Sequence, residues 1–519
     1  MLLCALIGGV LGLAMADDAL RTVAETSEFR ATARYSEVVD LLKRIDEASP
    51  RARLTELGVS GEGRPLPALI LADPPVDSPE AARATGKLIV LAIGNIHAGE
   101  VDGKEALPML AREIVRAPDE PLLRDLIIVL APIYNADGNE RVSKDNRPGQ
   151  VGPEEGMGQR ANAAGLDLNR DFIKLAASET RGLVEYLNRW DPAIFIDTHT
   201  TNGCYHRYVL TWEGPKAPAG DATLIEFVRD RMLPEVQQTL RGQGHDTFVY
   251  GDFDRDHTRW ETYPAQARYG TTYVGLRGRI SVLSEGYSYA PYRDRVLATR
   301  AFVREILEYA ARNRALIAAT LKAVDQRATD GVGRPLALRT RAVAAPQRVT
   351  AAGVEEETRD GRVVSTGRPR DYSVELWTHF EPTLTVTRPW GYALPADANP
   401  DVLVNLRQHG LTVRRLITAA TAEVEVYRVD RVQVAEQTFQ QRRPTQVDAT
   451  PRAERRELPA GTFVLDCNHR LGNLTAYLLE PQSEDGLATW NFFDGALGAG
   501  RDFPVVRVVS PLPDANLSP

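Results

Sequence analysis

Short apolar runs alternate with amphipathic stretches through the first 327 residues of the chain. The runs at 88–93, 126–131, 193–196 and 280–283 are apolar at almost every position, which is typical of strands buried on both faces. Helical spacing of apolar residues predicts helices at 37–45 (with Ser36 as N-cap), 104–116, 179–190, 222–240 and 295–327. Two more strands are expected around the turn signal Gly61-Glu62-Gly63. This alternation predicts an α/β fold with a mixed, mainly parallel sheet that is covered by helices on both faces.

The pattern changes after residue 327. Residues 328–371 are polar, show little helical periodicity and predict a linker or connecting segment. Short runs at 383–387, 421–429, 462–465 and 474–479 then predict strands, with one small helix at 402–409. We therefore expect an α/β domain over 17–327 and a β-rich C-terminal domain over 372–519, with the aromatic residues at 490–494 in its core.

The N-terminus begins with an apolar run that ends in Ala14-Met15-Ala16. Small residues at these positions fit a signal peptide over 1–16, cleaved before Asp17, with a buried N-terminal helix as the alternative. Without the leader only Cys204 and Cys467 remain, which permit one disulfide but do not require it.

The composition limits the kinds of protein and partner to be expected. Charged residues make up 25% and hydrophobic residues 43% of the chain, as in a soluble globular protein. The net charge of -8 gives no reason to expect nucleic acid as a partner. No run after the N-terminus is long and apolar enough to predict a membrane span.

Polar residues that could bind a metal or take part in catalysis follow the buried runs. These are the strand ends at which an open α/β sheet places its site. His97 and Glu100 follow 88–93 with an i, i+3 spacing that points both side chains to one side of a turn. This is half of a zinc site, although the same pattern is common by chance in solvated turns. His199 follows 193–196 and offers a third ligand, whereas nearby His206 is expected on the cleft wall or surface.

Five motifs in order resemble the zinc metallocarboxypeptidases related to carboxypeptidase A, over about residues 30–320. They are His97-x-x-Glu100; Asn135-Ala136-Asp137-Gly138; the set Arg160, Asn169 and Arg170; His199; and Glu285. Ala136 replaces the proline of the family motif. The resemblance is to a bacterial, secreted member with a C-terminal β-rich extension, and it implies an eight-stranded-type sheet and one Zn²⁺ per chain.

The resemblance also implies a role for each residue. His97, Glu100 and His199 would bind the metal and leave one position open for water, as in other His₂Glu sites. Glu285 would take the proton of that water and pass it to the leaving amine, while Arg160 stabilises the oxyanion.

Binding of the substrate follows from the same resemblance. Asn169 and Arg170 would grip a free carboxylate, and Asp167 would orient a histidine ligand. Tyr269 is preferred to Tyr263 and Tyr273 as the tyrosine that closes over the substrate.

The expected activity is hydrolysis of the C-terminal bond of a peptide or peptide-like substrate, in a secreted or periplasmic location. A murein-peptide amidase or an N-acyl-amino-acid deacylase on the same site is the alternative. A non-catalytic binding protein would require a lost ligand or a lost general base, and the sequence shows neither.

Overall fold

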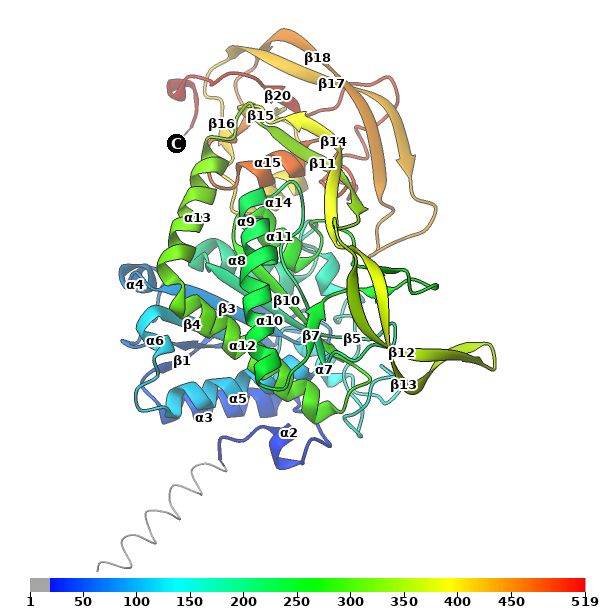
Figure 1. Ribbon diagram of the computed structural model, residues 1–519. Helices are drawn as coiled ribbons and strands as arrows, with labels where there is room; N and C mark the ends of the chain where they lie inside the picture. The colour runs from blue at the N-terminus through cyan, green and yellow to red at the C-terminus, as the bar shows by residue number, and fades with distance from the viewer. Residues whose placement is uncertain (1–18, 519) are drawn as a thin grey trace, which may run out of the picture.

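The computed structural model describes residues 19–518 of the chain (Figure 1). The signal peptide expected over 1–16 therefore lies outside the described residues. Within them, no helix combines the length and apolar character needed to cross a bilayer.

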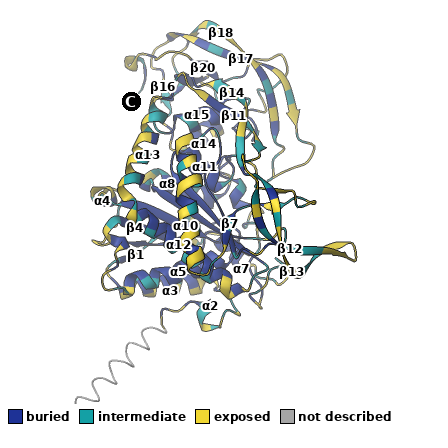
Figure 2. Cartoon of the chain, in the orientation of Figure 1, coloured by how far each residue is buried: buried dark blue, intermediate teal, exposed yellow. Residues whose placement is uncertain are grey.

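An eight-stranded sheet forms the centre of the first part of the chain. Its order is β1 (Ala52–Val59), β2 (Pro65–Leu71), β4 (Leu126–Ala131), β3 (Leu88–Gly94), β5 (Ile194–Thr201), β10 (Ile280–Tyr287), β6 (Leu210–Glu213) and β7 (Thr247–Val249). The central strands β4, β3, β5 and β10 are parallel, and every residue of β3 and β4 is buried. These strands appear dark blue in Figure 2. The predicted α/β fold class is confirmed.

Helices cover both faces of this sheet. The larger ones are α3 (Tyr35–Ala48), α5 (Asp102–Arg116), α8 (Ser178–Trp190), α10 (Leu233–Gly242), α12 (Tyr292–Arg312) and α13 (Arg314–Thr329). Smaller ones are α2 (Val23–Thr26), α4 (Pro79–Ala84), α6 (Leu122–Asp125), α7 (Ala136–Glu140), α9 (Ala222–Glu226) and α11 (Gly270–Leu276). The 3₁₀ helix η1 (Leu168–Arg170) precedes α8, and the π-helical segment η2 (Phe227–Met232) joins α9 to α10.

Two of the helix predictions were wrong in detail. Ser36 is not the N-cap, because α3 begins at Tyr35 and Glu37 accepts from the backbone N–H of Arg34. The single helix expected over 295–327 is two helices, α12 and α13. They part at Asn313, which has non-helical backbone angles and donates from its side chain to the carbonyl of Tyr309. Asparagine competes in this way with helical hydrogen bonds.

The C-terminal part is rich in strands (upper part of Figure 1). A six-stranded sheet has the order β16 (Arg414–Arg415), β19 (Phe463–Asp466), β15 (Gly391–Leu394), β20 (Val506–Val508), β17 (Ala420–Val434) and β18 (Thr445–Leu458). The predicted small helix is confirmed as α14 (Pro400–Gln408), and η3 (Asp514–Asn516) lies near the C-terminus. The strand expected at 474–479 is wrong, because these residues lie in α15 (Gly472–Leu479). An apolar helix buried on all sides has the same pattern as a buried strand.

Residues 328–371 are not a simple connection. They contain β11 (Pro335–Val343), β12 (Val349–Arg359) and the first part of β13 (Arg362–Trp377). β11 pairs with β14 (His379–Thr387), and β13 pairs in parallel with β9 (Arg259–Glu261), which in turn pairs with β8 (Asp252–Phe253). Both faces of these strands carry polar residues, so the alternation that reveals a half-buried strand is weak. One small sheet thus joins strands from both sides of the boundary that we expected.

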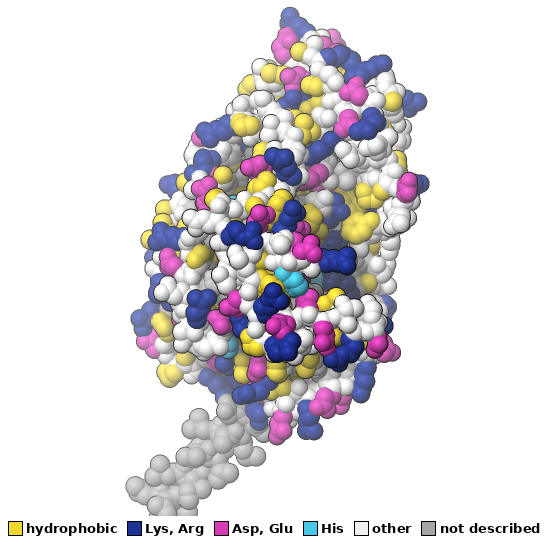
Figure 3. Space-filling view, turned by 45° about the vertical axis from the view of Figure 1, so that its right-hand side comes forward, with side chains coloured by type: hydrophobic (Ala, Val, Ile, Leu, Met, Phe, Trp, Pro, Cys, Tyr) yellow, Lys and Arg dark blue, Asp and Glu magenta, His cyan; other side chains and the backbone are white. Residues whose placement is uncertain are grey.

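One large hydrophobic core runs through both parts of the chain. It includes Ile196 on β5 and Trp490 near the C-terminus, both fully buried, as we expected for the aromatic residues at 490–494. On the surface in Figure 3, basic and acidic side chains are interspersed.

Candidate active site

The turn after β3 is built by Gly94 and Asn95. A Cβ on Gly94 would lie 2.9 Å from the backbone of Gly103, so only glycine lets the start of α5 pack this closely. Asn95 adopts a φ of 66° and donates from its side chain to the carbonyl of Ala98 at 3.0 Å. This left-handed residue reverses the chain, and His97 and Glu100 come to lie on the same side of the turn.

His97, Glu100 and His199 meet at one buried point. Their ligating atoms all lie within 4.8 Å of one another. The Glu100 carboxylate lies between the two imidazoles, with Oε1 3.0 Å from His97 Nδ1 and Oε2 2.9 Å from His199 Nδ1. Two imidazoles and a carboxylate on a buried point match the donor set of a catalytic zinc, and the residues present fit this ion.

A second carboxylate lies behind each imidazole. Asp167 Oδ1 is 2.9 Å from His97 Nε2, as the resemblance implied, and Asp197 Oδ2 is 2.8 Å from His199 Nε2. Carboxylates in this position fix the tautomer and the direction of a ligating histidine. Sequence reasoning missed Asp197, although its spacing of two from His199 on a strand places both side chains on one face.

These contacts shift the pKa values of Glu100 and His199. Burial alone would raise the pKa of Glu100, but His97 and Arg147 outweigh it and hold this pKa well below its usual range. Burial would likewise lower the pKa of His199, but Asp197 and Glu100 raise it well above the ordinary value. Neighbouring groups of opposite charge thus cause both shifts.

The pKa of Glu285 is shifted in the opposite direction from that of Glu100. Burial, with the nearby Glu100 carboxylate, raises its pKa to about 8, although His199 and two arginines act in the other direction. Its Oε2 is buried and has no hydrogen-bond partner among the described residues. A carboxyl group poised near neutrality and free of protein partners is suited to proton transfer.

Two arginines flank the metal ligands. Arg160 donates to Asp167 at 2.9 Å and has its Nη1 3.5 Å from Glu100 Oε1, while 47% of its side chain is exposed. Arg147, which sequence reasoning missed, lies 3.0 Å from Glu100 and donates to the carbonyl of Thr200 at 2.7 Å. Nothing in its local sequence marks Arg147, because Glu100 and Thr200 lie 47 and 53 positions away along the chain.

The Asn135-to-Gly138 motif supports the site without lining its cavity. Asn135 caps α7 by accepting from the N–H of Gly138 at 2.9 Å, and it donates to the carbonyl of Arg160 at 3.2 Å. Asp137 is buried and accepts from the hydroxyl of Ser60 at 2.7 Å. The motif therefore fixes the backbone that carries Arg160.

Asn169, Arg170 and Tyr269 form a neighbouring group. Asn169 Oδ1 accepts from the N–H of Gly270 at 2.8 Å, which leaves its amide NH₂ for another partner. The Arg170 guanidinium lies 4.4 Å from the centre of the Tyr269 ring and donates to the carbonyl of Asn169. Within residues 19–518, no carboxylate lies at ion-pair distance from Arg170.

One cavity of about 190 Å³ brings these side chains together. It is lined by His97, Glu100, His199, Arg160, Asn169, Arg170, Tyr269 and Glu285, and by the unpredicted Arg147, Tyr250 and Tyr263. Tyr273 lies elsewhere, buried, with its hydroxyl 2.7 Å from His409 Nδ1. His206 was expected on a wall or surface but is buried, with its ring 3.9 Å from that of Tyr287. Cys204 and Cys467 are both free.

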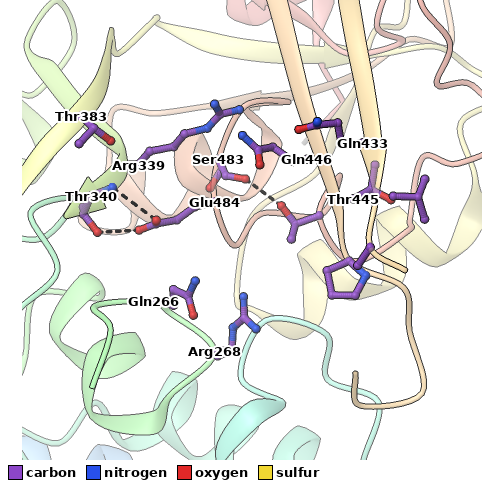
Figure 4. Close-up of a pocket in the computed structure, with 14 residues that line it drawn as sticks. Gln266, Arg268, Arg339, Thr340, Thr383, Gln433, Thr445, Gln446, Ser483 and Glu484 are labelled. Atoms are coloured by element: carbon purple, nitrogen blue, oxygen red, sulfur yellow. Dashed lines mark hydrogen bonds between the residues drawn. The ribbon is translucent and has the colours of Figure 1, made fainter. Parts of the chain in front are cut away.

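A larger cavity, of about 500 Å³, lies between the two parts of the chain. Figure 4 shows its walls: Gln266 and Arg268 from the first part face Gln433, Thr445 and Gln446 from strands of the C-terminal part. Its lining contains Glu484 but no histidine or cysteine, so it does not repeat the donor set of the smaller cavity.

The eight-stranded sheet and the smaller cavity place three metal-ligand candidates beside a buried carboxyl group and an arginine that has no ion-pair partner among the described residues. Residues 38–187 match the zinc carboxypeptidase family. Carboxypeptidase 2 of Trichophyton tonsurans is 24% identical over 480 residues, 86% of this chain and 81% of that protein. Carboxypeptidase D of Mus musculus is 34% identical over 163 residues, 27% of this chain and 12% of that protein. A metallo-carboxypeptidase structure from Burkholderia cenocepacia aligns with a TM-score of 0.39 and 17% identity, covering 53% of this chain and 68% of that one.

The family match and the curated relatives support the zinc carboxypeptidase family for this chain. The protein is a metallocarboxypeptidase.

Proposed function

We propose that this protein uses one Zn²⁺ to hydrolyse the last bond of a peptide or peptide-like substrate that has a free carboxylate. The observation that carries the proposal is the position of Arg170. Its guanidinium lines the same cavity as the three metal-ligand candidates and Glu285, and no carboxylate among residues 19–518 pairs with it. A charge kept available beside a metal site fits a substrate that brings its own carboxylate.

His97 Nδ1, His199 Nδ1 and a Glu100 oxygen would hold the ion. Zn²⁺, when bound, supplies a Lewis acid that polarises a carbonyl and lowers the pKa of water. Asp167 and Asp197 keep the two imidazoles directed at the ion from behind.

Two other side chains of the site have separate catalytic roles. Glu285 accepts the proton of the attacking water and delivers it to the leaving amine. Arg160 remains charged at any relevant pH and stabilises the oxyanion that develops on the scissile carbonyl.

Binding of the substrate sets which bond is cleaved. Arg170 and the free NH₂ of Asn169 grip the terminal carboxylate, and the Tyr269 ring covers this pair. Fixing the carboxylate fixes the register of the chain, so one bond is presented to the catalytic groups.

We also propose export of the protein to a secreted or periplasmic location after cleavage before Asp17. N-terminal sequencing of the exported protein tests this. The division into a catalytic domain over 17–327 and a β-rich C-terminal domain from Tyr372 is likewise a proposal. The separate six-stranded sheet supports it, whereas the pairing of β13 with β9 and the shared core connect the two parts.

The experiment that tests the activity uses the zinc-loaded protein, peptides of about ten residues and mass spectrometry of the products. The proposal expects release of single C-terminal residues only. A panel of C-terminal residues that includes D-residues, diaminopimelate and N-acyl amino acids separates a carboxypeptidase from a murein-peptide amidase or a deacylase. Internal cleavage would contradict the proposal.

A further inference from the structure

The turn between β17 and β18 reaches from the C-terminal part to the loop that carries Arg160, Asn169 and Arg170. Gln440 Oε1 accepts from the backbone N–H of Asp167 at 2.8 Å, and Gln441 donates to the carbonyl of Ala164 at 2.6 Å. These two side chains belong to residues more than 270 positions away from their partners.

The backbone of this turn is unusual for its sequence. Phe439 and Arg442 pair across it, and the two residues between them, Gln440 and Gln441, have φ angles of 52° and 60°. A two-residue turn with both φ angles positive strongly favours asparagine and glycine. Two glutamines here cost backbone energy, and both of their side chains are used to contact the loop at 164–167.

Asp167 is the centre of the loop that Gln440 holds. Its carboxylate contacts His97 and Arg160, and its Oδ1 accepts from the N–H of Asn169 at 2.9 Å. The hydrogen bond from the Asp167 N–H to Gln440 therefore fixes the start of the short turn that presents Asn169 and Arg170.

The C-terminal part also holds the other side of the same pocket. Asp485 is fully buried; it accepts from the backbone N–H of Arg268 and lies 2.9 Å from the guanidinium of that residue. Arg268 immediately precedes Tyr269 and Gly270, and the N–H of Gly270 holds Asn169. Arg268 also lines the large cavity between the two parts, where Figure 4 shows it below the C-terminal strands.

We propose that the C-terminal part positions the carboxylate-binding pocket of the enzyme, with Gln440 and Asp485 as positioning residues on either side of Asn169. This inference rests on the proposed function, because it assigns the two residues an effect on the grip of a substrate carboxylate. It gives the C-terminal part a role in substrate binding rather than in stability alone.

The decisive variant is Gln440→Met, because this partly exposed residue can change without altering the core. It keeps the length of the side chain but removes the acceptor for Asp167. We expect KM for a free-acid peptide to rise about fivefold, the scale of one lost hydrogen bond. The values of kcat, zinc content and KM for the matching C-terminal amide should stay unchanged.

Two further variants control the experiment. Gln437→Met changes an exposed glutamine of the same turn and should behave like the wild type. Gln440→Glu keeps an acceptor oxygen at the same reach and should restore most of the lost affinity for the acid.

The outcomes separate this inference from the proposed function. If the wild type does not distinguish acid from amide, the proposed function fails. If the wild type distinguishes them and Gln440→Met does so equally well, only the positioning role is overturned. An equal rise of KM for the acid and the amide in Gln440→Met would also overturn the positioning role, because it would indicate a general structural effect.

Discussion

Glu285 lies directly beside His199, because the two residues are register partners on the adjacent parallel strands β10 and β5. Partners at the same register of a parallel pair direct their side chains to the same face of the sheet. The strand pairing thus places the candidate general base next to a candidate metal ligand. The geometry of the site depends on this pairing, and both residues can be tested separately.

Replacing Glu285 with glutamine should remove the base and retain the shape of the site. We expect kcat to fall by roughly 10²–10⁴, the range for general acid–base catalysis, with KM and zinc content nearly unchanged. Steady-state kinetics and metal analysis of the same preparation check this. Turnover close to that of the wild type would assign the proton transfer to another group.

Replacing His199 with alanine should abolish stoichiometric zinc binding, because only two of the three candidate ligands remain. Metal analysis after dialysis measures the effect. His245→Ala, outside the cavity, is the control and should retain one Zn²⁺ per chain. Full zinc occupancy in His199→Ala would refute the proposed ligand set.

Asp197 provides a test that the sequence alone did not suggest. Asp197→Asn keeps the shape of the residue but removes the charge 2.8 Å from His199 Nε2. Loss of such a partner typically lowers metal affinity about 10- to 100-fold. Competition with a chelator of known affinity measures the zinc affinity of the variant and of the wild type. Equal affinities would show that the charge of Asp197 does not support metal binding.

His409 links stability to pH through the contact between α14 and the catalytic part. It lies between Tyr273 and the carbonyl of Ile173, and burial lowers its pKa to about 3. The unfolded chain, with a histidine pKa near 6.5, binds more protons between these two values, so stability is complete above about pH 6.5 and declines as the pH falls toward 3.

From this histidine alone, the free energy of unfolding should be about 2 kcal/mol lower at pH 5 than at pH 8. Urea unfolding of the wild type and of His409→Gln at both pH values isolates the contribution, because other titrating groups are common to the two proteins. The same loss of stability in both proteins would show that His409 is not buried in its neutral form.

Much of the site could be read from the sequence because its residues follow buried strands. His97, Glu100, His199 and Glu285 come directly after apolar runs, and parallel strands bring such positions to one edge of a sheet. Asp197 and Arg147 were missed because their roles arise from contacts across strands and loops. Neither residue has a local pattern that distinguishes it from ordinary charged residues.

The fold was predicted where hydrophobic periodicity is strong and missed where it is weak or ambiguous. The central strands β3 and β4 are uniformly buried, and their runs gave a clear signal. Strands β12 and β13 have few buried positions, whereas almost all of α15 is buried and apolar, so their patterns resemble a loop and a strand. The contact of Gln440 with Asp167 joins residues far apart in the chain, and local patterns do not predict it.

The most direct test of the account compares Arg170→Ala with the wild type on a free-acid peptide and on its C-terminal amide. In the wild type, kcat/KM should be at least about 30-fold higher for the acid, because the amide leaves a desolvated guanidinium without its partner, at a cost of about 2–5 kcal/mol. In Arg170→Ala the acid should lose most of this advantage and the amide should change little, so that the two rates converge. Equal cleavage of acid and amide by the wild type would contradict a carboxypeptidase whose register is fixed by Arg170.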